Sequence, residues 1–583
     1  GSAYDRRVAA ELAGGTPLEP GLLPIDGCGL PLLDVWSRRH EAFGRAMLAE
    51  DRQAELVVVH LGTEFMAVEN LEAVSRLEEE LEAVRQWRRE QGPAGLELEL
   101  SGSAAVGRDI LLGAAESIRY TELFTVVLVL AILLAVYRSP LMALVPLLTI
   151  AVAQVVSLGV VAALTQVHEL PGMEWWQFHV FKTTKIFVVV ILFGGGTDYC
   201  LFLIARYREE LKHERRKRQA LRGALSAVGD ALAASALTTI LGLAMMAFAD
   251  FGKFRYSGPV IGLSLLITLA ACVTLAPALL AALGGWVFWP QKPERGPSQI
   301  AQSFWQQVAR WIVRRPGAIL VTSFLLMAIP AWYGWHSADN VTYDLLSELS
   351  PGKPSRRGAA LHRRHFAVGD SGPIVVLAHR PGAKFLEDDG RLSFAELGAI
   401  SNLTLDLRKI EGVHSVRSLA EPLGDYPSRL SPFSTAGIRK VTLQNHRVTK
   451  SIYLTHDPGV PVTRLEVVLD YDPFSLEAVE VLNDIDRRLR ILNLETDSFW
   501  SGTEFAYTGT TAAIRDLSRV TRSDYFRIQM LVVLAVFAVL WLVLRRTLVC
   551  LYMILTVLVS FYVTIGLTEA FFAWAYAGDF YGL

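Results

Sequence analysis

The sequence predicts a polytopic α-helical membrane protein that carries α+β domains outside the membrane. Three observations support this fold class. The chain of 583 residues is 52% hydrophobic with a mean hydropathy of +0.34, which is high for a soluble protein. Stretches without charge, such as "LFTVVLVLAILLAVY", alternate with highly charged ones, such as "NLEAVSRLEEELEAVRQWRREQ". An internal repeat joins one soluble segment and one apolar segment in each copy.

Apolar runs of about 20 residues predict the membrane spans, because that length crosses the hydrocarbon core as a helix. The eight expected spans cover residues 121–138, 141–166, 183–206, 231–249, 257–284, 317–336, 527–545 and 548–577. The expected domains are a partial outer α+β domain (1–120), five membrane helices (121–284), a cytoplasmic linker (285–316), one membrane helix (317–336), a second outer α+β domain (337–526) and two membrane helices of a truncated bundle (527–583).

Basic loops set the expected orientation. The connector "RYREELKHERRKRQALR" follows the third span, and "RWIVRRPG" precedes the sixth. Short loops rich in Lys and Arg stay in the cytoplasm, so residues 1–120 and 337–526 are expected outside it. The net charge of -2 gives no general attraction to nucleic acid, and no nucleic-acid partner is expected.

Alternating patterns predict strands and helices in the outer domains. "LEVVLDY" and "FAYTG" have the pattern of strands, and "SLEAVEVLNDIDRRLRIL" between them has that of an amphipathic helix. "ELVVVHL", a helix over 70–92 and "LELEL" repeat the same order in the first domain. Each outer domain is therefore expected to contain a strand-helix-strand unit.

No cofactor, metal site or enzymatic site is expected. The four cysteines are scattered without metal-ligand spacing or a disulfide framework. The outer domains contain His and Asp, including "LHRRHF" at 361–366, but no nucleophile-base spacing emerges, and this run fits a solvated basic face better. These features favour a transporter over an enzyme.

The repeat aligns "LSGSAAVGRDILLGAAESIRYTELF" with "YTGTTAAIRDLSRVTRSDYFRIQML" at a constant offset of 407. This offset brings Gly102 onto Gly509, Arg108 onto Arg515, Asp109 onto Asp516 and Arg138 onto Arg545. Both copies run in the same direction, as in transporters built from parallel repeats. The counterpart of Asp198 would fall at 198 + 407 = 605, beyond Leu583. Together with the opening "GSAYDRR", which lacks a Met, this arithmetic predicts a fragment that lacks the first span and the last three of twelve.

The stretch "FGGGTDYCLF" places Asp198 deep inside the third span. Asp198 lies about 15 residues into that span, or roughly 22 Å at helical rise. A buried carboxylate is costly in lipid and is a functional candidate by default. Burial favours its protonated form, which suits a group that binds and releases protons. Tyr199 adds a phenol that can donate to the carboxylate.

Small residues surround this carboxylate. Gly194, Gly195 and Gly196, followed by Thr197, allow close helix packing and are expected to loosen the helix locally. The other interpretation is that Asp198 is structural and caps a helix broken by the glycines.

Three hydroxyls in the next span lie on one helical face. Ser235, Thr238 and Thr239 are spaced i, i+3 and i+4. They are candidate hydrogen-bond partners for Asp198 across a helix pair. The alternative is that they bond to carbonyl groups of their own helix, as Ser and Thr commonly do.

The motifs "GGGTDYCLFLIARYREEL" and "ALTTILGLAMMAFADFGKFR" resemble the MMPL (mycobacterial membrane protein large) branch of the resistance-nodulation-division (RND) exporters. The resemblance covers nearly the whole chain. It implies proton-driven export of lipids or other hydrophobic molecules from the bacterial cytoplasmic (inner) membrane, with porter-like α+β domains outside. It also implies that Asp198 and Tyr199 form half of a proton relay, completed by an Asp-Tyr pair in span ten, to which "AYAGDFYGL" looks like the lead-in.

Two other functions fit a related architecture. One is a sterol- or lipid-sensing receptor, for which the sequons at Asn340 and Asn402 would fit a secretory setting. The other is a proton-driven helper of protein translocation. The expected partners of the exporter are a hydrophobic substrate, protons and membrane lipids, and the sequence specifies neither the substrate nor the oligomeric state.

Overall fold

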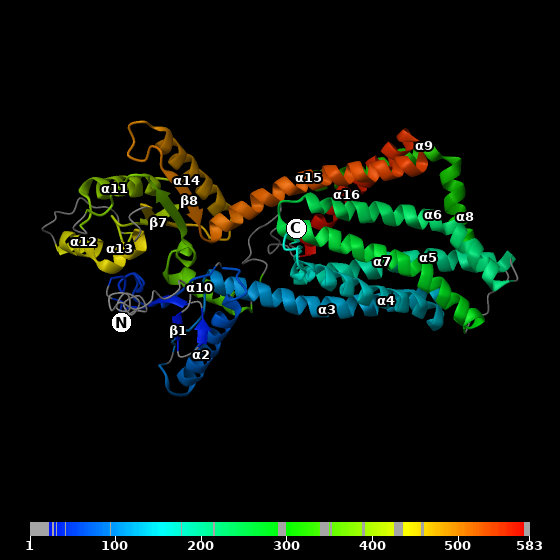
Figure 1. Cartoon of the computed structure of the whole chain (residues 1–583), viewed down its shortest axis with the longest axis horizontal. Helices are drawn as coiled ribbons and strands as arrows, with labels where there is room; N and C mark the ends of the chain where they lie inside the picture. Colours follow the sequence, from blue (N-terminus) through cyan, green and yellow to red (C-terminus); the bar gives the residue numbers. More distant parts are fainter. Residues whose placement is uncertain are drawn as a thin grey trace. The chain divides into compact units, whose positions relative to one another are not determined.

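The computed structural model describes residues 23–575, with gaps at 26–27, 31, 41, 64, 94, 177, 214–215, 290–298, 338–348, 350–351, 388–390, 425–434 and 456–459. The chain divides into two compact units (Figure 1). Unit 1 combines Gly1–Gly113 with Tyr343–Ser518, and unit 2 combines Ala114–Thr342 with Arg519–Leu583. Asn340 and all but the first residue of "AYAGDFYGL" lie outside the described residues.

Unit 1 contains an antiparallel four-stranded sheet in the order β6-β7-β5-β8. The elements follow along the chain as β5 (Ile374–His379), α11 (Phe394–Arg408), β6 (Val413–Arg417), β7 (Val462–Leu469), α14 (Leu476–Leu494) and β8 (Glu504–Thr508). This β-α-β-β-α-β order with that strand arrangement is ferredoxin-like. The strand-helix-strand unit expected near the end of the second outer domain is therefore confirmed as β7, α14 and β8.

The core of unit 1 lies between this sheet and its helices. Strand β5 alternates buried and half-buried residues, as expected for a sheet covered on one face. Its buried Ile374 and Val376 belong to the same apolar cluster as Leu403 of α11 and Leu482 of α14. Both helices therefore cover one face of the sheet.

Unit 1 also contains further strands and helices outside this sheet. They are β1 (Leu23–Ile25), β2 (Cys28–Leu30), β3 (Leu32–Trp36), β4 (Val58–Leu61), α2 (Asn70–Gln91), α10 (Pro354–His365), α12 (Thr435–Asn445) and α13 (Arg447–Tyr453). The strand expected at "LELEL" was wrong. Leu96–Leu100 joins no sheet in the part of the chain that the structure describes, because Arg85 Nε donates to the Leu98 carbonyl at 2.8 Å and Arg88 donates to that of Leu96.

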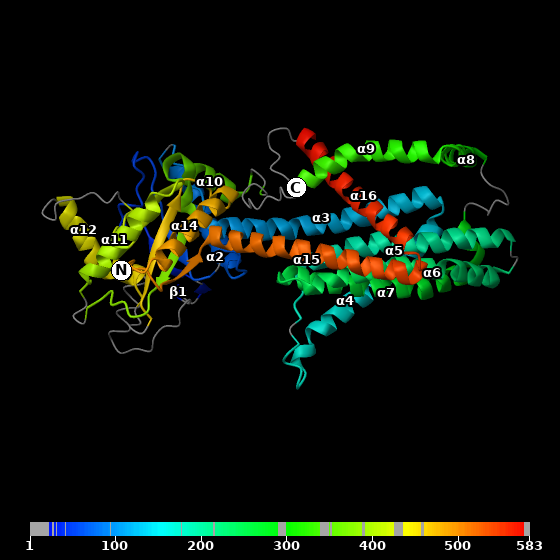
Figure 2. The same cartoon turned by 90° about the horizontal axis from the view of Figure 1, so that it is seen from above.

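Unit 2 is helical. Its helices are α4 (Pro140–Thr165), α5 (Lys182–His213), α6 (Lys217–Ala244), α7 (Gly252–Leu283), α8 (Gln299–Arg314), α9 (Pro316–Ser337) and α16 (Thr547–Ala575). Helices α4 to α7 pack against one another, and α9 packs against α16, which it crosses in Figure 2. Seven helices in the described chain are long and apolar enough to cross a membrane. The first expected span, 121–138, is represented by the shorter apolar segment Phe124–Tyr137.

The internal repeat is visible in two helices of 35 residues each, α3 (Ser103–Tyr137) and α15 (Thr510–Leu544). The residue before each helix, Gly102 or Gly509, has φ of 108°. The residue after each helix, Arg138 or Arg545, has φ of 51°, which is uncommon for a residue other than glycine. The repeat therefore preserves backbone geometry as well as sequence.

Candidate functional site

Helix α5 carries the expected site without a break. The helix runs continuously from Lys182 to His213, so the three glycines do not interrupt it. Asp198 therefore caps no broken helix. The expected loosening of the helix at the glycines is not observed, because α5 remains α-helical through all three of them.

Two of the three glycines permit close packing inside unit 2. A Cβ atom on Gly196 would lie 2.8 Å from Thr268 Cγ2 and 3.0 Å from Ile150 Cγ1. One on Gly195 would lie 3.3 Å from Leu265 Cδ1. One on Gly194 would meet no atom within 4 Å. Gly195 and Gly196 therefore face neighbouring helices, whereas Gly194 faces outward.

This difference supports a matched pair of substitutions. Gly196→Leu is expected to destabilise unit 2 by about 1–3 kcal/mol, because the added side chain meets α4 and α7. A Cβ atom on Gly159 of α4 would also meet no atom within 4 Å, so Gly159→Leu is expected to leave thermal unfolding in detergent nearly unchanged. Equal shifts in Tm for the two variants would contradict this packing.

Asp198 lies on an exposed, otherwise apolar stripe of α5. Its neighbours one turn away on either side are Gly194 and Phe202, and Phe202 is 60% exposed. Phe187 and Val190 extend the stripe towards the start of the helix. Asp198 makes no hydrogen bond or ion pair with another residue that the structure describes. The carboxylate is thus the single ionisable group on this face between Phe187 and Phe202.

Tyr199 lies on a different face of α5. It is buried in an apolar cluster that includes Met142 of α4, Leu265 of α7 and its neighbour Cys200. Consecutive helical residues point about 100° apart, which accounts for the contrast with the exposed Asp198. Within unit 2, the two side chains expected to form a relay do not share one face.

The hydroxyl groups near the site bond within their own helices. Thr197 Oγ1 donates to the carbonyls of Phe193 and Gly194 at 2.6 and 2.8 Å. Thr238 and Thr239 both donate to the Ser235 carbonyl, at 2.8 and 3.2 Å. Among the described residues these hydroxyls donate to their own helices, and none donates to Asp198.

A pair of buried thiols beside the site has no counterpart in the sequence-based predictions. Cys200 Sγ of α5 lies 3.4 Å from Cys272 Sγ of α7, and both cysteines are free. The two cysteines stand 72 positions apart in the sequence. The proximity depends on how α5 packs against α7, so the sequence carried no local signal for it.

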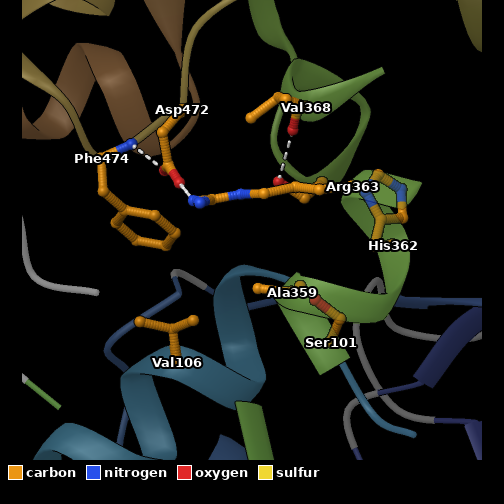
Figure 3. Close-up of a pocket in the computed structure, with 10 residues that line it drawn as sticks. Ser101, Val106, Ala359, His362, Arg363, Val368, Asp472 and Phe474 are labelled. Carbon is orange, nitrogen blue, oxygen red and sulfur yellow. Dashed lines mark hydrogen bonds and ion pairs between the residues drawn. The ribbon is translucent and has the colours of Figure 1, made fainter. Parts of the chain in front are cut away.

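A small cavity in unit 1 is lined in part by α10. Its volume of about 10 Å³ is close to the smallest that holds one water molecule. Arg363 points across it towards Asp472, with which it forms an ion pair, and Phe474 lies beside them (Figure 3). Burial lowers the pKa of His362, on the same wall, below its usual value. The cavity is too small for a lipid.

The basic run expected to be a solvated face is largely paired. His365 Nδ1 lies 2.7 Å from Asp51 Oδ2, and Arg364 lies 3.6 Å from Glu97. No group of three or more His, Cys, Asp or Glu side chains that could hold a metal occurs within the described ranges.

A profile of the MMPL family matches residues 31–319 and 356–579. The chain is 28% identical to the apo-petrobactin exporter of Bacillus anthracis over 504 residues, which cover 82% of this chain and 58% of that protein. It is 30% identical to the putative membrane protein ActII-3 of Streptomyces coelicolor over 341 residues, covering 58% and 45%. It is 29% identical to the sulfolipid-1 exporter MmpL8 of Mycobacterium tuberculosis over 381 residues, covering 65% and 32%.

The matched part of the chain spans about half the length of each of the first two of these relatives. The family match extends over both units, including α5 with Asp198 and the two repeat helices α3 and α15. Seven helices long enough to cross a membrane accompany it in the described chain. The chain is therefore an integral membrane protein that belongs to the MMPL family.

Proposed function

We propose that this chain is part of a proton-driven exporter of lipids or other hydrophobic molecules, and that Asp198 is its proton-binding group. The exposed position of Asp198 on the apolar stripe of α5 carries the proposal. An ionised carboxylate that faces lipid is costly, and such a group usually faces a bundle interior, a partner or a water path.

The stripe around Asp198 has the character of a helix interface. Its residues are apolar or small, and exposed apolar patches of this kind mark contacts with another surface. We propose that a further membrane helix of the exporter covers it and supplies the second Asp-Tyr pair that the family resemblance implies. Gly194 would then be the point of closest approach, because no described atom lies within 4 Å of a Cβ placed there.

The proposed substrate class follows the relatives. Two of them are named after the molecule that they export, which is apo-petrobactin in one case and sulfolipid-1 in the other. These names favour export over sterol sensing or protein translocation. The small cavity in unit 1 offers no room for such a molecule, so the proposed substrate path lies elsewhere.

Proton binding would act through charge removal. Protonation of Asp198 neutralises the one ionisable group on the stripe, which lowers the cost of packing that face against apolar neighbours. We propose that the resulting helix movement reaches unit 1 along α3 and α15, since each of these helices contains residues of both units. Export would follow as antiport, with protons moving inward and substrate outward.

Proton transport into liposomes tests the proposal. In the full-length protein, Asp198→Asn is expected to reduce gradient-driven proton flux by at least about tenfold, because an amide does not take up protons in the physiological range. Glu209→Gln is the matched control, since this exposed carboxylate lies about three turns further along the same helix, beyond the apolar stripe, and pairs with Arg206 at 2.9 Å. A pH-sensitive dye inside the vesicles reports the flux. Unchanged flux in a folded Asp198→Asn protein would rule out the relay.

A further inference from the structure

A buried carboxylate on α15 binds the turn between α6 and α7. Asp524 is fully buried, with 0% of its side chain exposed. Its Oδ1 accepts the backbone N–H of Asp250 at 2.9 Å, and its Oδ2 accepts that of Phe251 at 2.7 Å. These two amides lie immediately before α7. A carboxylate from one helix therefore satisfies free N–H groups at the start of another, where negative charge is favourable.

Arg527, one turn further along α15, completes this contact. Its Nη1 donates to Asp250 Oδ2 at 2.9 Å and to the Phe248 carbonyl at 3.4 Å, and it lies 3.9 Å from Asp524 Oδ1. We call Asp524, Arg527, Asp250 and the amide of Phe251 the α15 clamp. The clamp joins α15 to this turn by both charge and backbone hydrogen bonds.

An apolar contact extends the attachment towards the site. A Cβ atom on Gly242 of α6 would lie 3.6 Å from Val532 Cγ1 of α15, which is ordinary van der Waals contact. Helix α6 also packs against α5, the helix of Asp198. Helix α15 is thus fixed to the helix pair that neighbours the proposed proton-binding helix.

The clamp connects the two repeats, and the positions of the first repeat that match its two α15 residues carry no charge. Asp524 and Arg527 belong to the second repeat, whereas Asp250 and Phe251 follow the first copy. At the offset of 407, the counterparts of Asp524 and Arg527 are Ser117 (524 − 407) and Tyr120 (527 − 407). Neither residue can provide this pair of charges.

We propose that the α15 clamp transmits proton-dependent movement of helices α5, α6 and α7 to helix α15. Asp524 is the positioning residue that holds α15 against the turn before α7. This inference rests on the proposed function. In transporters built from repeats, the two halves move against each other, so a charged contact that joins them is placed to convert movement of one half into movement of the other. Helix α15 begins at Thr510 in unit 1 and so extends from the clamp into that unit.

Hydrogen–deuterium exchange tests the clamp without reference to transport. In Asp524→Ala, the amides of Asp250 and Phe251 lose their acceptor, and the peptide covering 248–254 is expected to exchange faster by about tenfold. Asp524→Asn keeps one acceptor oxygen and is expected to give an intermediate rate. The control is Asp516→Ala on the same helix, whose side chain is 64% exposed. Unchanged exchange in Asp524→Ala would overturn the clamp itself.

Paired flux and export assays in liposomes test transmission. Asp524→Ala is expected to reduce substrate export by about tenfold while proton flux stays close to that of the wild type, because proton binding occurs at Asp198 and the clamp acts after it. Retention of both activities, or loss of both in a folded protein, would overturn the role of Asp524. Asp198→Asn in the same assay separates the two proposals, since unchanged flux in that variant would reject the proton relay while the exchange result still reports on the clamp.

Discussion

Replacing Asp109 by alanine is expected to lower the free energy of unfolding of unit 1 by about 3–5 kcal/mol, because it leaves a buried charge without its partner. The side chains of Arg108 and Asp109 are only 5% and 4% exposed. Asp109 Oδ1 accepts hydrogen bonds from Nε and Nη2 of Arg108 at 3.0 and 2.7 Å. Its Oδ2 accepts the backbone N–H of Ser355 at 3.0 Å, in the first turn of α10.

The repeat provides the control for this substitution. Asp516 stands at the matching position, but its side chain is 64% exposed and lies 3.5 Å from Arg515 Nε. Asp516→Ala is therefore expected to cost at most about 1 kcal/mol. Denaturant unfolding in detergent, followed by exchange of peptides from α10, measures both variants. Equal losses would show that the buried contact of Asp109 contributes nothing beyond an exposed pair.

Replacing Gly334 of α9 by leucine is expected to separate α9 from α16. A Cβ atom on Gly334 would lie 2.0 Å from the Tyr562 carbonyl oxygen and 2.7 Å from the Gly566 amide nitrogen. One on Gly566 would lie 2.1 Å from the Pro330 carbonyl oxygen. These atoms belong to backbone and cannot move aside as a side chain does, so the cost should reach or exceed the upper end of about 1–3 kcal/mol for overpacking.

Small residues that bring two backbones together are a common basis of helix association in membranes. Gly317→Leu, on the same helix, is the matched control, since its Cβ atom would meet nothing within 4 Å. Cross-linking between cysteines introduced on α9 and α16 measures the separation. Efficient cross-linking in Gly334→Leu, equal to that of Gly317→Leu, would contradict the close approach.

Features that depend on local periodicity could be predicted from the sequence. Helix α5 was expected over 183–206 and extends from Lys182 to His213. The last strand-helix-strand unit of unit 1 and the offset of 407 were also correct. The strand at Leu96–Leu100 was predicted from its alternating pattern, and this prediction was wrong. Two arginine side chains donate hydrogen bonds to its carbonyl groups.

Contacts between distant residues could not be predicted in this way. Asp524 meets the amides of Asp250 and Phe251 across 274 and 273 residues, and Asp109 meets Ser355 across 246. Nothing in the neighbouring sequence distinguishes Asp524 from an ordinary charged residue within a helix. The same limit applies to Asp198, whose exposure depends on which face of α5 packs inward.

The turns that end α3 and α15 show how the two halves have diverged. An L-residue in the left-handed region costs roughly 1–2 kcal/mol, yet both Arg138 and Arg545 adopt it at φ of 51°. Residues 102–138 and 509–545 therefore have equal length and begin and end with the same backbone geometry. The backbones of the two segments match in length and in the conformation of their end residues. Exchanging one for the other would retain helix length and chain direction and alter only side chains, so evolution could have made the halves unlike without redesigning either helix.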